Sequence, residues 1–240
     1  MSFLHLNNVK TSPITPYSWT AFLEELANIL PSYRNKQDEL LKCLFQAIEK
    51  NIYDQETKGK KTLLTEIDPF TFISIIFAMG IKKRKIALTH FKSFFNMKEN
   101  IPKDFYGIPN TEPRSSWLFS YRYERKQNDI DLLWDIFEKG LDDSINNELW
   151  TKVLNIKQTG MAKLTGGLFC FLSKKYFLIN KMTKPFLTDN GLEVELPRYE
   201  DYKNLLVKIN DKFENFHYYE ISYASWKYVN NINTDTKIKK

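Results

Sequence analysis

Cysteine and glycine are both scarce in this sequence of 240 residues. The two cysteines, Cys43 and Cys170, lie far apart in apolar stretches, so we expect neither a disulfide framework nor a zinc site. Both are expected to be buried, in a reducing, cytoplasmic setting. Only eight glycines occur, and Asn-Gly and Asp-Gly pairs are few, which disfavours an all-β sandwich.

Long apolar runs and nucleotide-binding motifs are also missing. No apolar run approaches the roughly 20 residues of a membrane span, and residues 1–10 lack the apolar core of a secretory signal. We therefore expect no membrane partner. The pair Gly59-Lys60 lacks both the upstream glycine and the following Ser or Thr of a phosphate-binding loop, and that pattern occurs nowhere else in the chain. No cofactor is expected.

Signals of a catalytic site are equally sparse. The histidines His5, His90 and His217 have no second His or Cys at metal-ligand spacing. No Gly-x-Ser-x-Gly elbow is present, and the acidic residues between 189 and 195 lack the closely following lysine of a metal nuclease. We expect no catalytic residue, no metal site and no enzyme activity in these 240 residues.

Positive charge is concentrated in the middle of the chain. Residues 58–126 hold 14 Lys or Arg against 6 Asp or Glu, whereas residues 1–57 hold 5 against 7 and residues 127–240 hold 16 of each. A basic segment favours a polyanionic partner such as double-stranded DNA. The alternative is a lysine-rich surface that only contacts water.

Apolar residues recur at helical spacing along most of the chain. This periodicity predicts a mainly α fold with a small β element (α+β), built from helical hairpins around an aromatic-rich core. Residues 53–62 are predicted to form an exposed loop, and residues 160–187 a helix followed by a short strand. The predicted helices are 19–30, 37–52, 69–79, 81–96, 128–141, 145–154, 199–212 and 222–229.

Three segments are expected from composition and charge. Residues 1–57 form an N-terminal helical hairpin, residues 58–157 a basic segment with an aromatic strand, and residues 158–240 a mixed or helical segment. Residues 58–240 are expected to form one compact domain, on which the first hairpin packs.

The basic segment contains a helix, a glycine turn and a second helix. The second helix begins with Lys82, Lys83, Arg84 and Lys85. Cations at a helix N-terminus oppose the helix dipole, but a DNA-reading helix-turn-helix places such residues against phosphates. The alternative is an ordinary helical hairpin with a solvated basic end.

The aromatic run Trp117–Tyr123 alternates as a strand does. Aromatic side chains stack on bases, and neighbouring cations contact phosphates, so this stretch is a candidate DNA-binding site. The alternative is that these rings pack on the preceding helices. The stacking candidates are Tyr106, Trp117, Phe119 and Tyr121, and the phosphate-contact candidates beside them are Arg114, Arg122, Arg125 and Lys126.

Two blocks carry a family resemblance. The first, residues 68–141, reads DPFTFISIIFAMGIKKRK, PKDFYGIP, SSWLFSY and NDIDLLWDIF in order; the second, KLTGGLFCFLSKKYFLINKMTKPFL, is followed by YYEISYASW at 218–226. This order resembles the region ahead of the AAA+ motor in McrB-like proteins, the GTP-driven subunits of modification-dependent restriction systems. The segment FLINKMTKPFL departs from the family in lacking an acidic residue near its centre.

The resemblance implies a specificity domain that recognises double-stranded DNA, often methylated or otherwise modified at cytosine. An AAA+ GTPase motor and a nuclease subunit would be its partners in antiviral defence. The Walker motifs of the motor are absent from this sequence. The alternative function is a helical adaptor that links a DNA reader to a motor or nuclease without contacting DNA.

Overall fold

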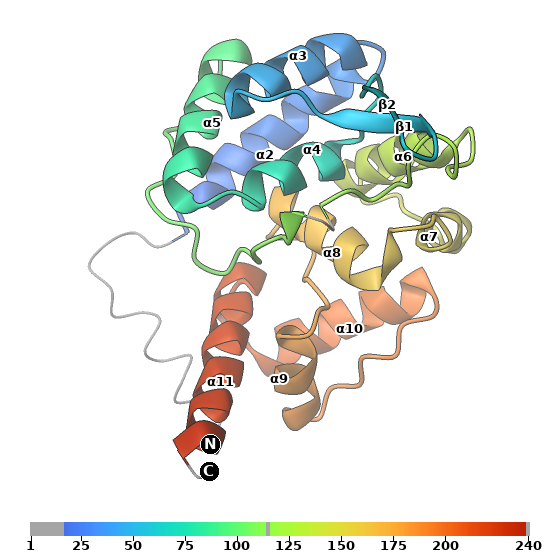
Figure 1. Ribbon diagram of the computed structural model, residues 1–240. Coiled ribbons are helices and arrows are strands. Elements are labelled where there is room, and N and C mark those ends of the chain that lie inside the picture. Colours follow the sequence, from blue (N-terminus) through green and yellow to red (C-terminus); the bar gives the residue numbers. More distant parts are fainter. Residues whose placement is uncertain (1–16, 114–115, 239–240) are drawn as a thin grey trace.

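The computed structural model describes residues 17–113 and 116–238 and is mainly helical (Figure 1). Within this described part, ten α-helices and one short 3-10 helix accompany a sheet of two antiparallel strands. Aromatic side chains are grouped through the core, for example Phe72 stacked on Phe91. The predicted fold class, mainly α with a small β element around an aromatic-rich core, is confirmed.

The first half of the chain forms the upper part of the molecule in Figure 1. In chain order its elements are α2 (Trp19–Ile29), the 3-10 helix η1 (Leu30–Tyr33), α3 (Gln37–Ile48), β1 (Tyr53–Thr57), β2 (Lys60–Leu63), α4 (Pro69–Phe77) and α5 (Ile81–Phe94).

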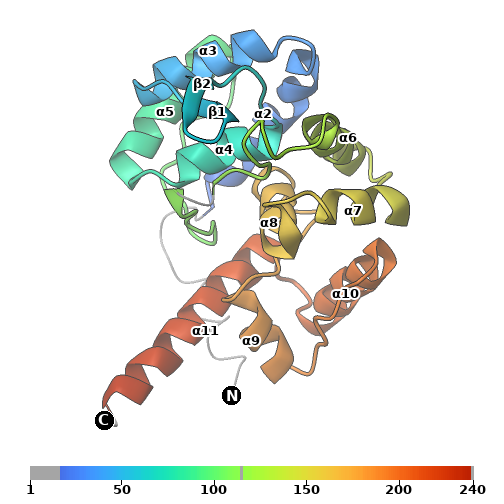
Figure 2. The ribbon, with the colours of Figure 1, turned by 45° about the vertical axis from the view of Figure 1, so that its right-hand side comes forward.

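The second half crosses the middle of the molecule and builds the lower part (Figure 2). Its elements are α6 (Asp129–Leu141), α7 (Asn147–Leu154), α8 (Gly160–Phe171), α9 (Thr183–Asp189), α10 (Tyr199–Lys212) and α11 (Tyr218–Ile238). Helix α11 extends well beyond the predicted range of 222–229, and it projects away from the rest of the fold in Figure 2.

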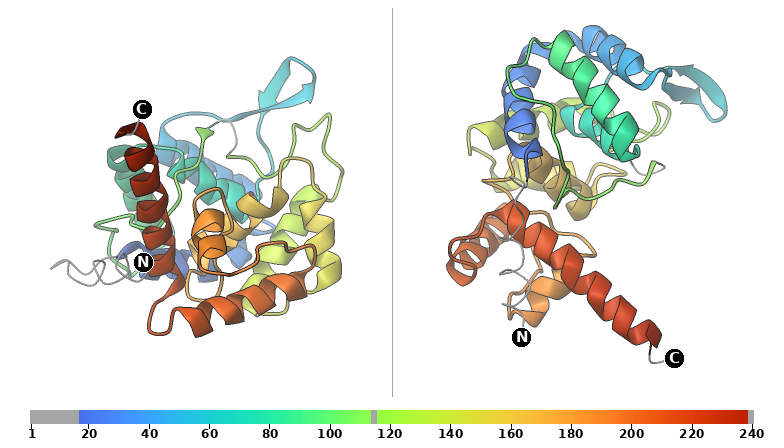
Figure 3. Two further views of the ribbon diagram at one scale, coloured as in Figure 1. Left: turned by 90° about the horizontal axis from the view of Figure 1, so that it is seen from below. Right: turned by 90° about the vertical axis from the view of Figure 1, so that its left-hand side faces the viewer.

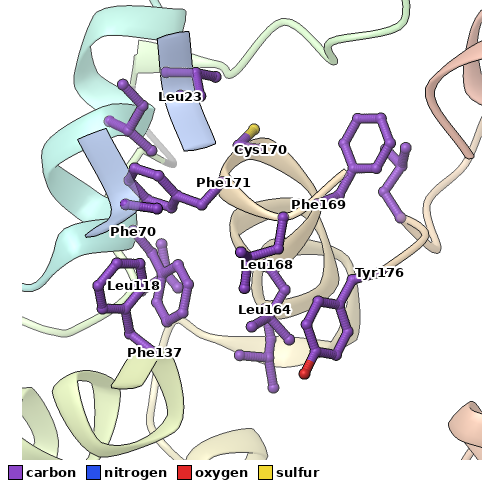
Figure 4. Packing of buried hydrophobic residues seen from close by; sticks show 14 of the residues in the cluster. Leu23, Phe70, Leu118, Phe137, Leu164, Leu168, Phe169, Cys170, Phe171 and Tyr176 are labelled. Atoms are coloured by element: carbon purple, nitrogen blue, oxygen red, sulfur yellow. The ribbon is translucent and has the colours of Figure 1, made fainter. Parts of the chain in front are cut away.

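Helix α8 lies at the centre of the core. Every residue from Leu164 to Phe171 is buried, and the helix packs against α2, α4 and α7. Figure 4 shows Phe171 of α8 beside Phe70 of α4 and Phe137 of α6, whose rings also contact one another. A helix that is apolar on all sides can be stable only when other elements cover it.

Both cysteines are free and buried, as the sequence predicts. Burial disfavours a charged thiolate, and it raises the pKa of Cys43 and of Cys170 to about 12.

The strand predicted over Trp117–Tyr123 is wrong. The chain there forms bends and turns, and side chains from other elements bind its backbone groups. The Leu118 N–H donates to Thr71 Oγ1, and the Leu118 carbonyl accepts from Thr159 Oγ1. The strand predicted after α8 is also wrong, because Tyr202 Oη bonds both the N–H and the carbonyl of Phe177.

The sheet forms instead at residues 53–63, where the sequence predicts a loop. Tyr53 pairs with Leu63 and Gln55 pairs with Lys61 in antiparallel register. Gly59 takes a positive φ of 88° in the turn, and its N–H donates to Gln55 Oε1. The resulting hairpin stands out from the body in both views of Figure 3.

The long loop after α5 contacts both the start of the described chain and its last helix, α11. Asp104 accepts hydrogen bonds from the backbone N–H groups of Tyr17 and Ser18. Gly107 takes a φ of 80° and contacts the backbone of α11 so closely that a Cβ there would lie 2.5 Å from the Tyr219 carbonyl oxygen. The loop therefore joins the N-terminal helices to α11.

Candidate nucleic-acid interface

The hairpin β1–β2 is joined to the segment 121–126 by a buried carboxylate. Asp54 Oδ1 accepts hydrogen bonds from the Gln55 and Arg122 N–H groups, while Asp54 Oδ2 pairs with Arg125 Nη1. The Tyr123 N–H also donates to the Gln55 carbonyl. These bonds place the basic residues after the aromatic run directly against the edge of β1.

Arg125 is therefore a structural residue and does not face solvent. Its side chain is 6% exposed and that of Asp54 is 3% exposed. The second guanidinium nitrogen pairs with Glu66, and the group lies over the Phe119 ring at 5.3 Å. The prediction that Arg125 contacts phosphate is wrong for this conformation, because both of its terminal nitrogens are already bound to carboxylates.

Exposed cations surround the hairpin. Lys60 pairs with Glu56, and the other exposed cations near the hairpin have no carboxylate within ion-pair distance among the described residues. The nearby acids Glu66 and Glu124 are paired with Arg125 and Lys157. Of the predicted phosphate contacts, Arg122 and Lys126 belong to this group. We call it the hairpin surface, and its cations are Lys58, Lys60, Lys61, Arg122 and Lys126.

Exposed aromatic rings lie on the same surface. Tyr121 and Tyr123 are about two-fifths exposed, and their rings stack with centroids 6.2 Å apart. Tyr53 at the base of β1 is also exposed. Of the predicted stacking residues, Tyr121 is exposed and could stack on a base. Trp117 is half-buried, with its ring centroid 5.7 Å from that of Tyr121, and Phe119 is buried in the core.

The start of α5 forms a separate basic site. Lys82 and Lys83 are exposed, whereas Lys85 Nζ donates to the Lys103 carbonyl. In Figure 1 the hairpin and α5 lie on opposite sides of the upper half of the molecule. The sequence groups these lysines with Arg122 and Lys126, but the fold separates them.

Arg84 is buried, so the prediction that it contacts phosphate on the surface is wrong. Its Nη2 donates to the carbonyls of Phe77, the last residue of α4, and of Met79 in the turn that follows. Loss of hydration lowers the pKa of its guanidinium. Tyr106 lies near this end of α5, packed on Tyr223 of α11 at 4.9 Å. Arg114 lies outside the described residues.

Five residues of this surface are not among the candidates predicted from the sequence: Lys58, Lys60, Lys61, Tyr53 and Tyr123. The run Lys58-Gly59-Lys60-Lys61 begins the basic segment, and its charge alone could have indicated a candidate site. Local sequence patterns do not predict that the hairpin containing this run contacts residues 121–126, about 60 positions later.

No metal-binding cluster is found in the part of the chain that the structure describes: no three His, Cys, Asp or Glu side chains are grouped suitably. Among the same residues, no helix has the length and apolar character needed to cross a membrane. His5 lies outside the described residues.

Comparison with known proteins gives one match. A family model described as a domain of unknown function (DUF8425) matches residues 19–228. No curated protein matches the chain, and no solved structure matches it. The matched range contains the hairpin surface, the core helix α8 and the first half of α11.

Proposed function

The chain belongs to the DUF8425 family, and from this premise we propose that it is the DNA-binding specificity module of a McrB-like restriction system. The observation that carries the proposal is the hairpin surface, where exposed cations, all but Lys60 without a carboxylate partner among the described residues, lie beside the stacked rings of Tyr121 and Tyr123. Cations neutralise phosphates, and exposed rings stack on unpaired bases.

The buried ion pair of Asp54 and Arg125 lies beneath this surface and fixes the backbone that carries it. It holds Arg122, Tyr123 and β1 in one arrangement through hydrogen bonds to the same carboxylate. A rigid base reduces the conformational entropy that ordered contacts with DNA would otherwise cost. Arg125 would thus act on DNA binding through the position of its neighbours.

Partners would supply the chemistry. In this proposal an AAA+ GTPase motor and a nuclease subunit act on cytoplasmic double-stranded DNA that the chain recognises, with modified cytosine as the target. The support is the order of motifs at residues 68–141 and 163–226, together with the basic hairpin surface.

Fluorescence anisotropy with plain and cytosine-methylated duplexes tests the proposal. We expect binding that weakens steeply between 50 and 200 mM salt, as phosphate contacts require. The double variant Arg122→Ala/Lys126→Ala should weaken binding about tenfold and reduce the slope of log K against log salt by about 2. A matched control, Lys208→Ala/Lys212→Ala, removes two exposed cations from α10 and should leave binding unchanged.

No binding to either duplex below about 10 µM at low salt would contradict the proposal and favour the adaptor function. Equal losses in the two double variants would show that net charge matters and the hairpin surface does not. Charge reversal at Arg84 or Arg125 is unsuitable as a test, because both side chains are buried and hold the fold together.

A further inference from the structure

A cleft lies beside the Arg84 side chain, away from the hairpin surface. It consists of a cavity of about 550 Å³ between the α4–α5 turn and α11, and an adjoining cavity of about 520 Å³ that reaches α8. The two share the wall formed by residues 108–112, together with Asn180, Met182 and Trp226. Volumes of this size are typical of sites for small ligands.

The Arg84 guanidinium forms part of the wall of the first cavity and has no carboxylate partner among the described residues. It contacts the Phe77 and Phe105 rings, each centroid 4.8 Å from the central carbon, and the two rings meet edge to face. Nη2 donates to the carbonyls of Phe77 and Met79 and to Asn110 Oδ1, sharing one of its two N–H groups. Among the described residues, Nε is buried without an acceptor.

The C-terminal carbonyls of α4 offset only part of this charge, since a helix end carries about half an elementary charge. A buried cation is ordinarily paired with a carboxylate, because burial without a counter-charge is costly. Arg84 is only 3% exposed. The cavity beside it therefore has both the room and the charge to take an anionic group.

Among its apolar and neutral polar residues, the rest of the lining carries aromatic and basic side chains. Trp226 is about half exposed where the two cavities meet, and its ring stacks on Tyr223 with the planes 7° apart. Lys163 and Lys181 line the second cavity. Glu112, the one carboxylate among the described lining residues, is exposed at the edge. A ligand that fits would combine negative charge with a planar ring.

We propose that this cleft binds a nucleoside monophosphate, whose phosphate pairs with the Arg84 guanidinium while its base packs against Trp226. The site is separate from the hairpin surface and does not depend on the DNA-binding proposal. It would make the chain responsive to a small phosphorylated ligand.

Isothermal titration of the full chain with AMP, GMP, CMP and UMP tests the proposal, with inorganic phosphate and adenosine as partial ligands. We expect at least one monophosphate to bind more tightly than either partial ligand. Trp226→Ala should raise its Kd at least fivefold, as the loss of one stacking contact does. Arg84→Lys, checked for folding by circular dichroism, should raise it about tenfold, because a lysine cannot reproduce the guanidinium geometry.

Absence of binding by all four monophosphates at 1 mM would overturn the proposal, as would a Kd unchanged by Trp226→Ala. Inorganic phosphate binding as tightly as the monophosphates would overturn the role of the ring. If Arg84→Lys fails to fold, Trp226→Ala and the comparison of AMP with adenosine decide the matter. Arg122→Ala/Lys126→Ala should leave monophosphate binding intact, so failure of one proposal is distinguishable from failure of the other.

Discussion

Gly166 and Gly167 are neighbours in α8 but face different surroundings. A Cβ added at Gly167 would lie 2.5 Å from Cδ1 of Phe70, whereas one added at Gly166 would meet nothing within 4 Å. Gly167 thus lets α4 approach α8 closely, and Gly166 only borders the cleft. The sequence shows two equivalent glycines, and only their neighbours distinguish them.

Gly167→Ala should destabilise the fold by about 1–3 kcal/mol, because the buried Phe70 ring must move. Gly166→Ala is the matched control and should be neutral or stabilising by up to about 1 kcal/mol, since alanine favours a helix over glycine. Urea unfolding of both variants measures the difference. Equal midpoints would contradict the packing described for Gly167.

The arginines of the basic segment also differ at the residue scale. Arg84 binds the end of α4 and Arg125 pairs with Asp54, so among the described arginines of this segment Arg122 alone is exposed to solvent. Their net charge was predictable from the sequence, but their roles were not. Arginine suits both uses, because its fork of donors binds carbonyls and carboxylates as readily as phosphate.

At the scale of elements, α4 begins as its sequence predicts. Asp68 is the N-cap and accepts from the N–H groups of Phe70 and Thr71, and Pro69 occupies the first helical position. The carboxylate is completely buried, and its Oδ2 has no hydrogen-bond partner within the described part of the chain. Loss of hydration raises the pKa of Asp68 from 3.8 to about 6.

This raised pKa makes stability depend on pH. The folded chain binds the proton of Asp68 more tightly than the unfolded chain does. The contribution of Asp68 to the free energy of unfolding is therefore fully present below about pH 4 and is lost as the pH rises through about 6. The free energy of unfolding lost in this way is on the order of 3 kcal/mol. Asp68→Asn keeps an oxygen for the cap but cannot ionise. Its free energy of unfolding should fall less between pH 4 and 6 than that of the unsubstituted chain, and parallel curves would contradict this.

The two β predictions show what local patterns miss. Alternation of aromatic residues predicted a strand at 117–123, but a strand needs a neighbour, and Thr71 and Thr159 bind its backbone instead. The polar run 53–63 shows little alternation, yet it pairs with itself across a glycine turn. Helices were easier to predict, because their hydrogen bonds lie within one segment.

At the scale of the whole molecule, α8 is covered and the hairpin is not. Helix α8 contacts α2, α4 and α7, while the hairpin contacts solvent over much of its surface. Elements that are covered on all sides open only with the global unfolding of a protein, and exposed ones open locally.

Hydrogen exchange should therefore be slowest for the amides of residues 164–171 in α8. The paired amides of the hairpin β1–β2 should exchange with an opening free energy several kcal/mol lower. Mass spectrometry of peptides from both regions measures this. Equal protection would mean that the hairpin unfolds only together with the core.

The sequence by itself determined the helical class, the start of α4 at Asp68, the burial of both cysteines and the excess of positive charge in the middle of the chain. These features depend on periodicity, capping and composition, which are local. The tertiary structure decided which cations are exposed and where a cleft remains. Those depend on contacts between distant residues, such as Asp54 with Arg125, 71 positions apart, because burial is a property of the neighbours that the fold supplies.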